Sequence, residues 1–251
     1  MNRFPFAAAG QNSTVFEEAN GRAWLTRLCG MVCERGDERG PTRAQGLAVI
    51  ATDRGRFEGD GLVLVEAAFD DDSAFLTWQA AEGDVPSRET RDLRLASRWS
   101  FSRETGIWSR KDELTNKGEA AITVYRCRAR FVLSPARYEV YAQDSRWSTE
   151  NQGAWTTLHT GTLTLGCEWG RPTEGGTPYV ALRELGGDTG IAFHILPRGN
   201  WAIHVSAHAV MNGLPCAVVE LGPADDDLRL TLQPGETFAL PEILIQEMPL
   251  Q

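Results

Sequence analysis

Residues 121–133 read Ala121-Ile-Thr-Val-Tyr-Arg-Cys-Arg-Ala-Arg-Phe-Val-Leu133 and alternate between two kinds of side chain. Successive side chains of a β-strand point to opposite faces of a sheet, so this period of two predicts a half-buried strand. The face expected to be buried carries Thr123, Tyr125, Cys127, Ala129, Phe131 and Leu133. The opposite face carries Val124, Arg126, Arg128 and Arg130.

Neighbouring segments repeat this pattern, with turn residues between them. A further strand is predicted at 201–209, where His204, Ser206 and His208 lie opposite an apolar face made of Trp201, Ile203, Val205, Ala207 and Ala209. Asn20-Gly21 and Asn212-Gly213 are two-residue hairpin signals, because a type I′ turn needs positive φ at both central positions. The glycine-rich stretch 186–190 separates 179–185 from 191–196 in the same way. We therefore expect neighbouring strands to pair antiparallel.

The rest of the chain supports an all-β fold. No long segment shows helical periodicity with caps, and the strand-helix-strand alternation of parallel folds is missing. There is no internal repeat and no low-complexity linker. The sequence thus predicts one domain over residues 1–251, a large antiparallel sandwich of two sheets with little helix.

Composition excludes several classes of partner. The 251 residues carry 34 acidic and 25 basic side chains, a net charge of −9, without a cluster of Lys and Arg. This balance argues against nucleic acid and against an anionic membrane surface. The N-terminus is too short and too interrupted for an export signal, so we expect a cytoplasmic protein. Five scattered cysteines are interpreted as small core residues.

The usual catalytic motifs are absent from the sequence. It contains no nucleophile elbow, phosphate-binding loop, dinucleotide fingerprint or H-E-x-x-H zinc motif. Cys29 and Cys33 lack the second pair of ligands that structural zinc requires. His204 and His208 share a strand face but lie ~13 Å apart along it, too far to bind one ion together. We therefore expect no metal and no cofactor.

Tryptophan is the more informative residue type, with eight copies in the chain. Trp147, Trp155, Trp169 and Trp201 lie in the C-terminal half, the first three in or beside turn-like stretches. Aromatic rings next to amides and carboxylates suit sugars, whose C–H faces pack on rings while their hydroxyls need donors and acceptors. Core filling is the other interpretation of each tryptophan.

Five short motifs, in order, resemble the N-terminal domain of glycoside hydrolase family 36, the α-galactosidases. They begin with Tyr138-Glu-Val-Tyr-Ala-Gln-Asp-Ser-Arg-Trp147-Ser-Thr-Glu150 and the strand from Leu158 to Gly166. Thr177-Pro178-Tyr179 and Gly199-Asn200-Trp201 follow. The last motif is Leu232-Gln-Pro-Gly235-Glu236-Thr-Phe238-Ala-Leu-Pro241.

The resemblance implies a β-supersandwich of the galactose mutarotase type. It also implies that the catalytic aspartates lie on a (β/α)₈ barrel that begins where this chain ends, at Gln251. Such a barrel needs ~250 residues. We therefore expect a non-catalytic domain that packs on the barrel, shapes substrate access or assembly, and is inactive alone. An α-galactoside-type carbohydrate, the barrel and further copies of the chain are the expected partners.

The same resemblance transfers candidate residues for a sugar-facing or barrel-facing surface. These are Trp147, Glu150, Asn200 and Trp201. Two alternatives remain at this point. One is a free-standing carbohydrate-binding module with exposed tryptophans. The other is a mutarotase-type epimerase with His204 or His208 as general acid, for which the sequence names no matching carboxylate base.

Overall fold

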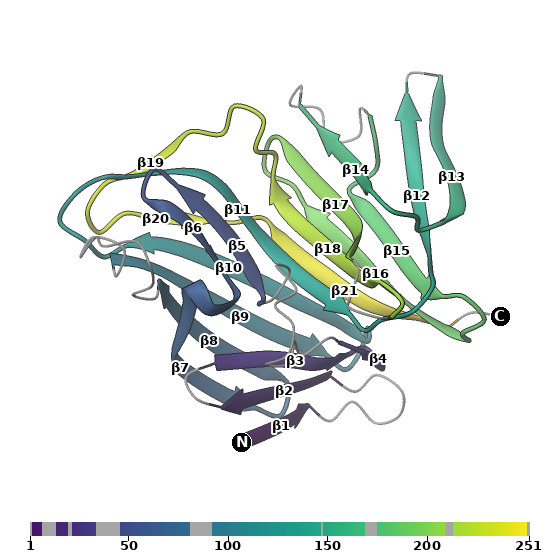
Figure 1. The fold of residues 1–251 in the computed structure, drawn as a ribbon, viewed down its shortest axis with the longest axis horizontal. Helices are drawn as coiled ribbons and strands as arrows, with labels where there is room; N and C mark the ends of the chain where they lie inside the picture. Colours follow the sequence, from purple (N-terminus) through teal and green to yellow (C-terminus); the bar gives the residue numbers. More distant parts are fainter. Residues whose placement is uncertain are drawn as a thin grey trace.

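A computed structural model of the chain describes residues 2–6, 14–19, 22–33, 46–80, 92–146, 148–168, 175–208 and 213–249. Within these ranges the protein is built almost entirely from antiparallel strands (Figure 1). The only helical element there is a short 3₁₀ turn, η1 (Gly59–Gly61). No described helix has the length and apolar character needed to cross a bilayer.

The largest sheet has ten strands. Its spatial order is β13 (Thr149–Thr157), β12 (Tyr138–Arg146), β15 (Tyr179–Glu184), β16 (Thr189–Leu196), β21 (Glu242–Pro249), β10 (Ile107–Asn116), β9 (Leu93–Ser102), β8 (Ser73–Ala80) and β7 (Leu62–Asp70). The tenth strand, β20 (Thr237–Ala239), pairs with the end of β10 that β21 leaves open.

Two further sheets face the large one. The seven-stranded sheet has the order β14 (Thr162–Cys167), β17 (Trp201–His208), β18 (Cys216–Pro223), β11 (Ile122–Leu133), β5 (Ala48–Thr52) and β6 (Gly55–Glu58), with β19 (Leu230–Leu232) beside the start of β11. The N-terminal sheet has four strands, β1 (Asn2–Phe6), β2 (Thr14–Ala19), β3 (Arg22–Leu28) and β4 (Met31–Val32).

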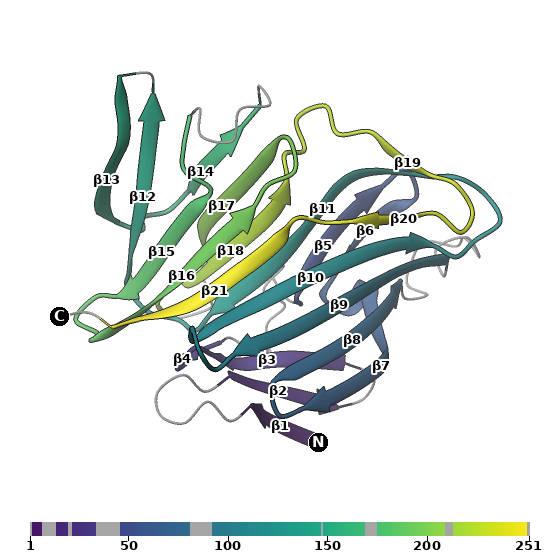
Figure 2. The ribbon, with the colours of Figure 1, turned by 180° about the vertical axis from the view of Figure 1, so that it is seen from behind.

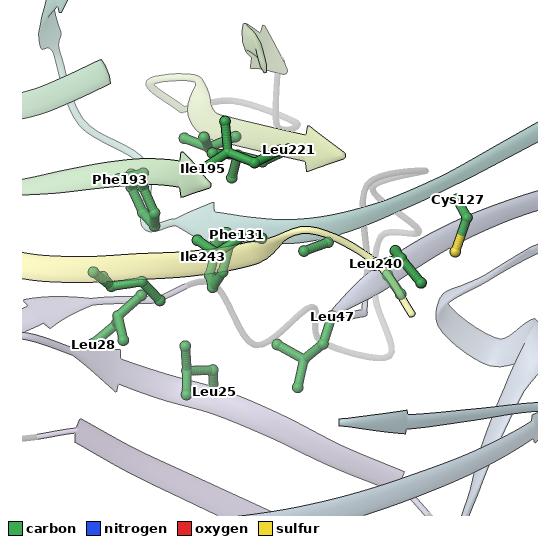
Figure 3. Packing of buried hydrophobic residues seen from close by; sticks show 14 of the residues in the cluster. Leu25, Leu28, Leu47, Cys127, Phe131, Phe193, Ile195, Leu221, Leu240 and Ile243 are labelled. Carbon is green, nitrogen blue, oxygen red and sulfur yellow. The ribbon is translucent and has the colours of Figure 1, made fainter. Parts of the chain in front are cut away.

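All three sheets contribute to one hydrophobic core. Leu25 and Leu28 of β3 point into it below Phe131 of β11, while Phe193 of β16 and Ile243 of β21 reach it from the large sheet (Figure 3). Ring contacts connect the layers, with centroids 4.8 Å apart for Phe131–Phe193, 6.0 Å for Trp99–Phe131 and 5.2 Å for Phe16–Trp99. The predicted all-β antiparallel sandwich is confirmed. The four-stranded sheet is a third sheet, whereas the sequence pattern predicted two.

Several of the turn predictions are confirmed by strand register. β2 and β3 pair antiparallel with Ala19 opposite Arg22, as a hairpin at Asn20-Gly21 requires, although those two residues lie outside the described ranges. β15 and β16 pair across the glycine-rich turn. β17 and β18 also pair, but their last matched residues are His208 and Cys216, so the connection is longer than the two residues expected. Asn212 lies outside the described ranges.

The predicted face assignment of residues 121–133 is half right. Cys127, Ala129, Phe131 and Leu133 do face the core, but Tyr125 is exposed and Val124 is buried in the core. The cause is a break in register between Val124 and Arg126, where β11 pairs with β5. A bulge inserts one residue and therefore moves every side chain before it to the other face of the sheet.

The core also encloses an ion pair. Arg110 of β10 binds Asp112 through Nη2 at 2.7 Å and donates a second bond to the Leu47 carbonyl at 2.8 Å. Its guanidinium lies 5.2 Å from the Trp99 ring centroid. Since a buried charge needs partners to offset its lost hydration, Asp112, the carbonyl and the ring together hold Arg110 between the sheets.

Candidate functional site

The four residues singled out by sequence fall in different environments. Trp147 lies outside the described ranges, and Glu150 belongs to β13, one of the edges of the large sheet. Asn200 is exposed in the turn between β16 and β17, where its Nδ2 donates to the Glu168 carbonyl at 2.8 Å. Trp201 begins β17 and is 0% exposed, so its ring fills the core instead of lining an accessible surface. A sugar-facing or barrel-facing role for Trp147, Glu150 and Asn200 stays a prediction.

Aromatic side chains gather instead on the outer face of the large sheet. Val140, Leu182 and Phe193 point into the core, and the alternation of each strand therefore turns the next residue outward. The set that we call the aromatic face consists of Tyr141, Trp155, Tyr179, Arg183 and His194. All five side chains are half-buried. Trp155 lies within β13, not in a turn as its sequence surroundings indicated.

The rings of the aromatic face form a continuous row across four strands. Tyr141 of β12 lies directly opposite Trp155 of β13, with centroids 5.5 Å apart and ring planes 54° apart. Tyr179 of β15 follows at 6.4 Å from Tyr141, and His194 of β16 at 6.3 Å from Tyr179. Burial lowers the pKa of His194 from its ordinary value, so its imidazole is neutral at pH 7.

Polar contacts hold these rings in place. Gln143 donates from Nε2 to the Tyr141 hydroxyl at 3.0 Å, and the Tyr179 hydroxyl donates to Sδ of Met248 at 3.2 Å. The Arg183 guanidinium lies 4.3 Å from the Trp155 ring centroid and donates from Nε to Glu139 at 2.8 Å. The aromatic face is therefore ordered without a ligand.

A pocket of about 230 Å³ opens where the edges of the two large sheets separate. Figures 1 and 2 both show β12 and β13 extending away from β14 at this end of the molecule. The lining residues are Val140, Thr156, Thr157, Leu158, His159, Thr160, Gly161, Thr162 and Leu163. These residues offer apolar side chains, threonine hydroxyls and the His159 imidazole, with no carboxylate and no guanidinium among them.

The outer face of the seven-stranded sheet is different, because it is built from charges. We call the charged face the set Glu58, Arg126, Arg128, Arg130, His204, His208, Glu220 and Asp225. The arginines come from alternate positions of β11 and point away from the core. Arg128 and Arg130 are nevertheless only 0% and 2% exposed.

Each carboxylate of the charged face binds an arginine. Arg130 reaches Glu220 at 2.6 Å through Nη2 and Glu58 at 2.6 Å through Nη1. Asp225 pairs with both Arg126 and Arg128. Burial alone would raise the pKa of the Asp225 carboxyl, but Arg128 and Arg126 hold it below its ordinary value. Asp225 belongs to the acidic run 225–227, and its partners come from the distant strand β11.

The histidines lie along one edge of the charged face. His204 lies opposite Glu220 in the register of β17 and β18. Nε2 of His208 forms a hydrogen bond of 3.1 Å with the Ser206 hydroxyl. Burial, with Arg128 adding to it, lowers the pKa of His204 from its ordinary value. Burial also lowers the pKa of His208, so both imidazoles are neutral at pH 7. Among the described residues, no three His, Cys, Asp or Glu side chains are placed to hold a metal ion.

Sequence reasoning missed the aromatic face although its signal was present. The strands at 138–146 and 179–184 alternate, and that alternation alone places Tyr141 and Tyr179 on the side opposite the core residues. The sequence does not show that the two strands are neighbours with β13 at the edge. Only this order brings Trp155 beside Tyr141.

No protein-family model matches the chain, and a search by sequence matches no curated protein. Solved structures match over almost its whole length. The α-galactosidase AgaA of family GH36 from Geobacillus stearothermophilus has a TM-score of 0.77 at 15% identity, over 99% of this chain and 41% of that enzyme. The α-galactosidase from Lactobacillus brevis has a TM-score of 0.74 at 14% identity, over 98% and 39%.

A smaller protein is also similar. A protein from Escherichia coli K12 assigned as a candidate aldose 1-epimerase matches over 99% of this chain and 100% of its own, with a TM-score of 0.54 and 13% identity. The chain spans about 40% of the length of the α-galactosidases. At these identities the likeness concerns the fold. The chain has the supersandwich fold of the N-terminal domain of the GH36 α-galactosidases.

Proposed function

We propose that the chain is the non-catalytic supersandwich domain of an α-galactosidase-like glycoside hydrolase. In this role it packs on a (β/α)₈ catalytic barrel and shapes substrate access or assembly. The observation that supports this most is the structural match, which includes nearly all of this chain but only about 40% of each α-galactosidase. The ordered motifs between Tyr138 and Pro241 support the same assignment. A cytoplasmic location and a homo-oligomer belong to this proposal.

The charges of the described residues agree with a non-catalytic role. Glycosidases need one carboxyl that protonates the leaving group and a second, ionised carboxylate as nucleophile or base. Within the charged face, Glu220, Glu58 and Asp225 each form an ion pair with arginine, so none of these carboxylates is free to act on a substrate. The pocket of about 230 Å³ contains no carboxylate in its lining.

The test is an activity assay with and without a barrel. The purified chain is expected to give no turnover of a chromogenic α-galactoside, whereas a GH36 catalytic barrel lacking its own N-terminal domain should bind it and gain thermal stability. Association is measured by size-exclusion chromatography. Turnover by the chain alone would overturn the non-catalytic assignment. Absence of any complex with that barrel would overturn the domain assignment.

A second candidate is an aldose epimerase, favoured by one specific observation. His204 lies across from Glu220 on adjacent strands, so the carboxylate that the sequence did not identify is present beside the neutral imidazole. Opening a sugar ring needs one group that accepts the proton of the anomeric hydroxyl and one that protonates the ring oxygen, and a His–carboxylate pair that holds one shared proton supplies both. Polarimetry on freshly dissolved α-D-galactose separates the candidates. Acceleration that His204→Asn abolishes would favour the epimerase, and the uncatalysed rate is the result expected for a non-catalytic domain.

A further inference from the structure

The aromatic face has the chemistry of a ligand site and not of a solvated sheet surface. An outward face of an antiparallel sheet is normally polar. Here the outward positions of four adjacent strands carry Trp155, Tyr141, Tyr179 and His194 in a contiguous row. Since large aromatic side chains gain most by leaving water, a row of them held half-exposed indicates that something covers it.

The shape of the face is set by a glycine. Tyr141 lies down across β13 because Gly153 has no side chain, and a Cβ at that position would meet the Tyr141 hydroxyl at 2.0 Å. The rings on either side are steeply inclined to Tyr141, Trp155 by 54° and Tyr179 by 76°. A ligand that stacks on Tyr141 would therefore meet an aromatic side chain on each flank.

The charge of the face selects a neutral ligand. Its cation, Arg183, is neutralised by Glu139, and His194 is uncharged at pH 7. The whole protein carries −9, which disfavours phosphate-rich and other anionic ligands. Amide and guanidinium groups border the rings, since Gln143 and Arg183 both retain N–H donors beyond the bonds described above.

We infer that Tyr141, Trp155 and Tyr179 form a binding site for an uncharged carbohydrate on the outer face of the large sheet. The C–H face of a pyranose packs on the rings, while its hydroxyls bind the Gln143 amide and the Arg183 guanidinium. Because contacts within the protein already order the rings, little side-chain entropy is lost on binding. All of these side chains belong to the present chain, so the site can be tested on the chain alone.

The test is a titration of the full chain with neutral oligosaccharides. Raffinose and maltopentaose are added up to 10 mM, and binding is followed by calorimetry and by tryptophan fluorescence. We expect saturable binding of at least one sugar with a fluorescence change. Trp155→Ala and Tyr141→Ala should each weaken binding about tenfold or more, as loss of an aromatic anchor does.

Two controls keep the result interpretable. Trp155→Phe retains a ring and should bind while losing the fluorescence change. Trp24→Phe, a half-buried tryptophan of the four-stranded sheet, should change neither affinity nor the size of the signal. Circular dichroism confirms that each variant is folded.

Two outcomes would overturn the inference. One is the absence of binding by either sugar at 10 mM, and the other is unchanged affinity in folded Trp155→Ala. If a catalytic barrel quenches Trp155 while sugars do not, the face docks a protein domain, and the carbohydrate site is refuted while the domain assignment stands.

Discussion

The two outer faces of this sandwich differ in how their polar groups are satisfied. On the charged face, six charged side chains from β6, β11, β18 and the segment after β18 bind one another, and its central arginines are almost inaccessible. The aromatic face has a single ion pair, and its rings are half-exposed. A face saturated by internal pairs has few groups left for a ligand. The comparison therefore assigns binding to the aromatic face and stability to the charged face.

Removing one carboxylate from the charged face should have the largest effect. Glu220→Ala leaves Arg130 buried with Glu58 alone and takes a second acid away from Arg128. Breaking a buried pair costs about 3–5 kcal/mol, and we expect about 3 because Glu58 remains. Urea unfolding of the purified protein measures the loss.

The matched control replaces both partners of that pair. Arg130→Met combined with Glu220→Leu should recover most of the free energy of unfolding, since no charge of the pair then stays buried. A loss below 1 kcal/mol in Glu220→Ala alone would show that the charged face is hydrated, and the contrast between the two faces would fail.

On the aromatic face, Gly153→Ala should have an intermediate effect. The added Cβ would overlap the Tyr141 hydroxyl, so the ring must leave its position and break its bond to Gln143. Such overpacking costs typically about 1–3 kcal/mol. Thermal unfolding gives the cost, and a changed Trp155 emission reports the displaced ring.

Gly61→Ala provides the comparison for that variant, because a Cβ there meets only Phe57 at 3.9 Å. It should leave both stability and emission nearly unchanged. Equal destabilisation in the two variants would mean that the effect at Gly153 comes from the backbone and not from Tyr141.

A smaller loss is expected from Arg183→Ala. This change removes the cation over Trp155 and the partner of Glu139. A cation–π contact near the surface is worth about 0.5–1 kcal/mol, and a pair this exposed adds little to it. Chemical denaturation of Arg183→Ala measures this loss of unfolding free energy, and Arg183→Lys is measured for comparison. Lys keeps the charge but cannot stack as a plane, so it should recover only part of the loss.

The histidines of the two faces should have the smallest effect on the free energy of unfolding at neutral pH. Their effect should appear when the pH is lowered. His204 and His194 have folded-state pKa values below the ordinary 6.5, mainly through burial. Below pH 6.5 the unfolded chain then binds more protons than the folded one, so the free energy of unfolding falls as the pH drops towards the folded pKa. Unfolding midpoints at pH 7.5 and 5.5 should show this loss, and His204→Gln should reduce it. An identical loss in His204→Gln would contradict the assignment.

Much of the architecture follows from local pattern. The alternation at 201–208 gave the correct inward and outward residues of β17, and the glycine-rich turn at 186–190 gave the β15–β16 pair. The alternation at 121–133 failed before Arg126 because the bulge depends on how β11 meets β5, which is not encoded in β11 alone. The four-stranded sheet was missed because its packing is set by contacts such as Phe16 with Trp99, which are 83 positions apart.

The candidate sites were less predictable than the fold. Trp201 was selected as a surface residue although its own alternation points it inward, and the structure buries it completely. Trp155 and Tyr141 were both visible as aromatic residues, but 14 positions separate them in the chain. The ion pairs of the charged face were not predicted, because Asp225, which binds Arg128, lies 97 positions away from it in the chain.

The sequence by itself determined the all-β class, most inward and outward faces, and the net negative charge that disfavours phosphate-rich partners. These properties depend on the period of two, the turn residues and the total charge. The tertiary structure decided which outward residues meet. Strand order and register place Trp155 beside Tyr141 and Glu220 beside Arg130 and His204. Pairing between distant strands is settled by burial of the whole core, and that is why it cannot be read from any one segment.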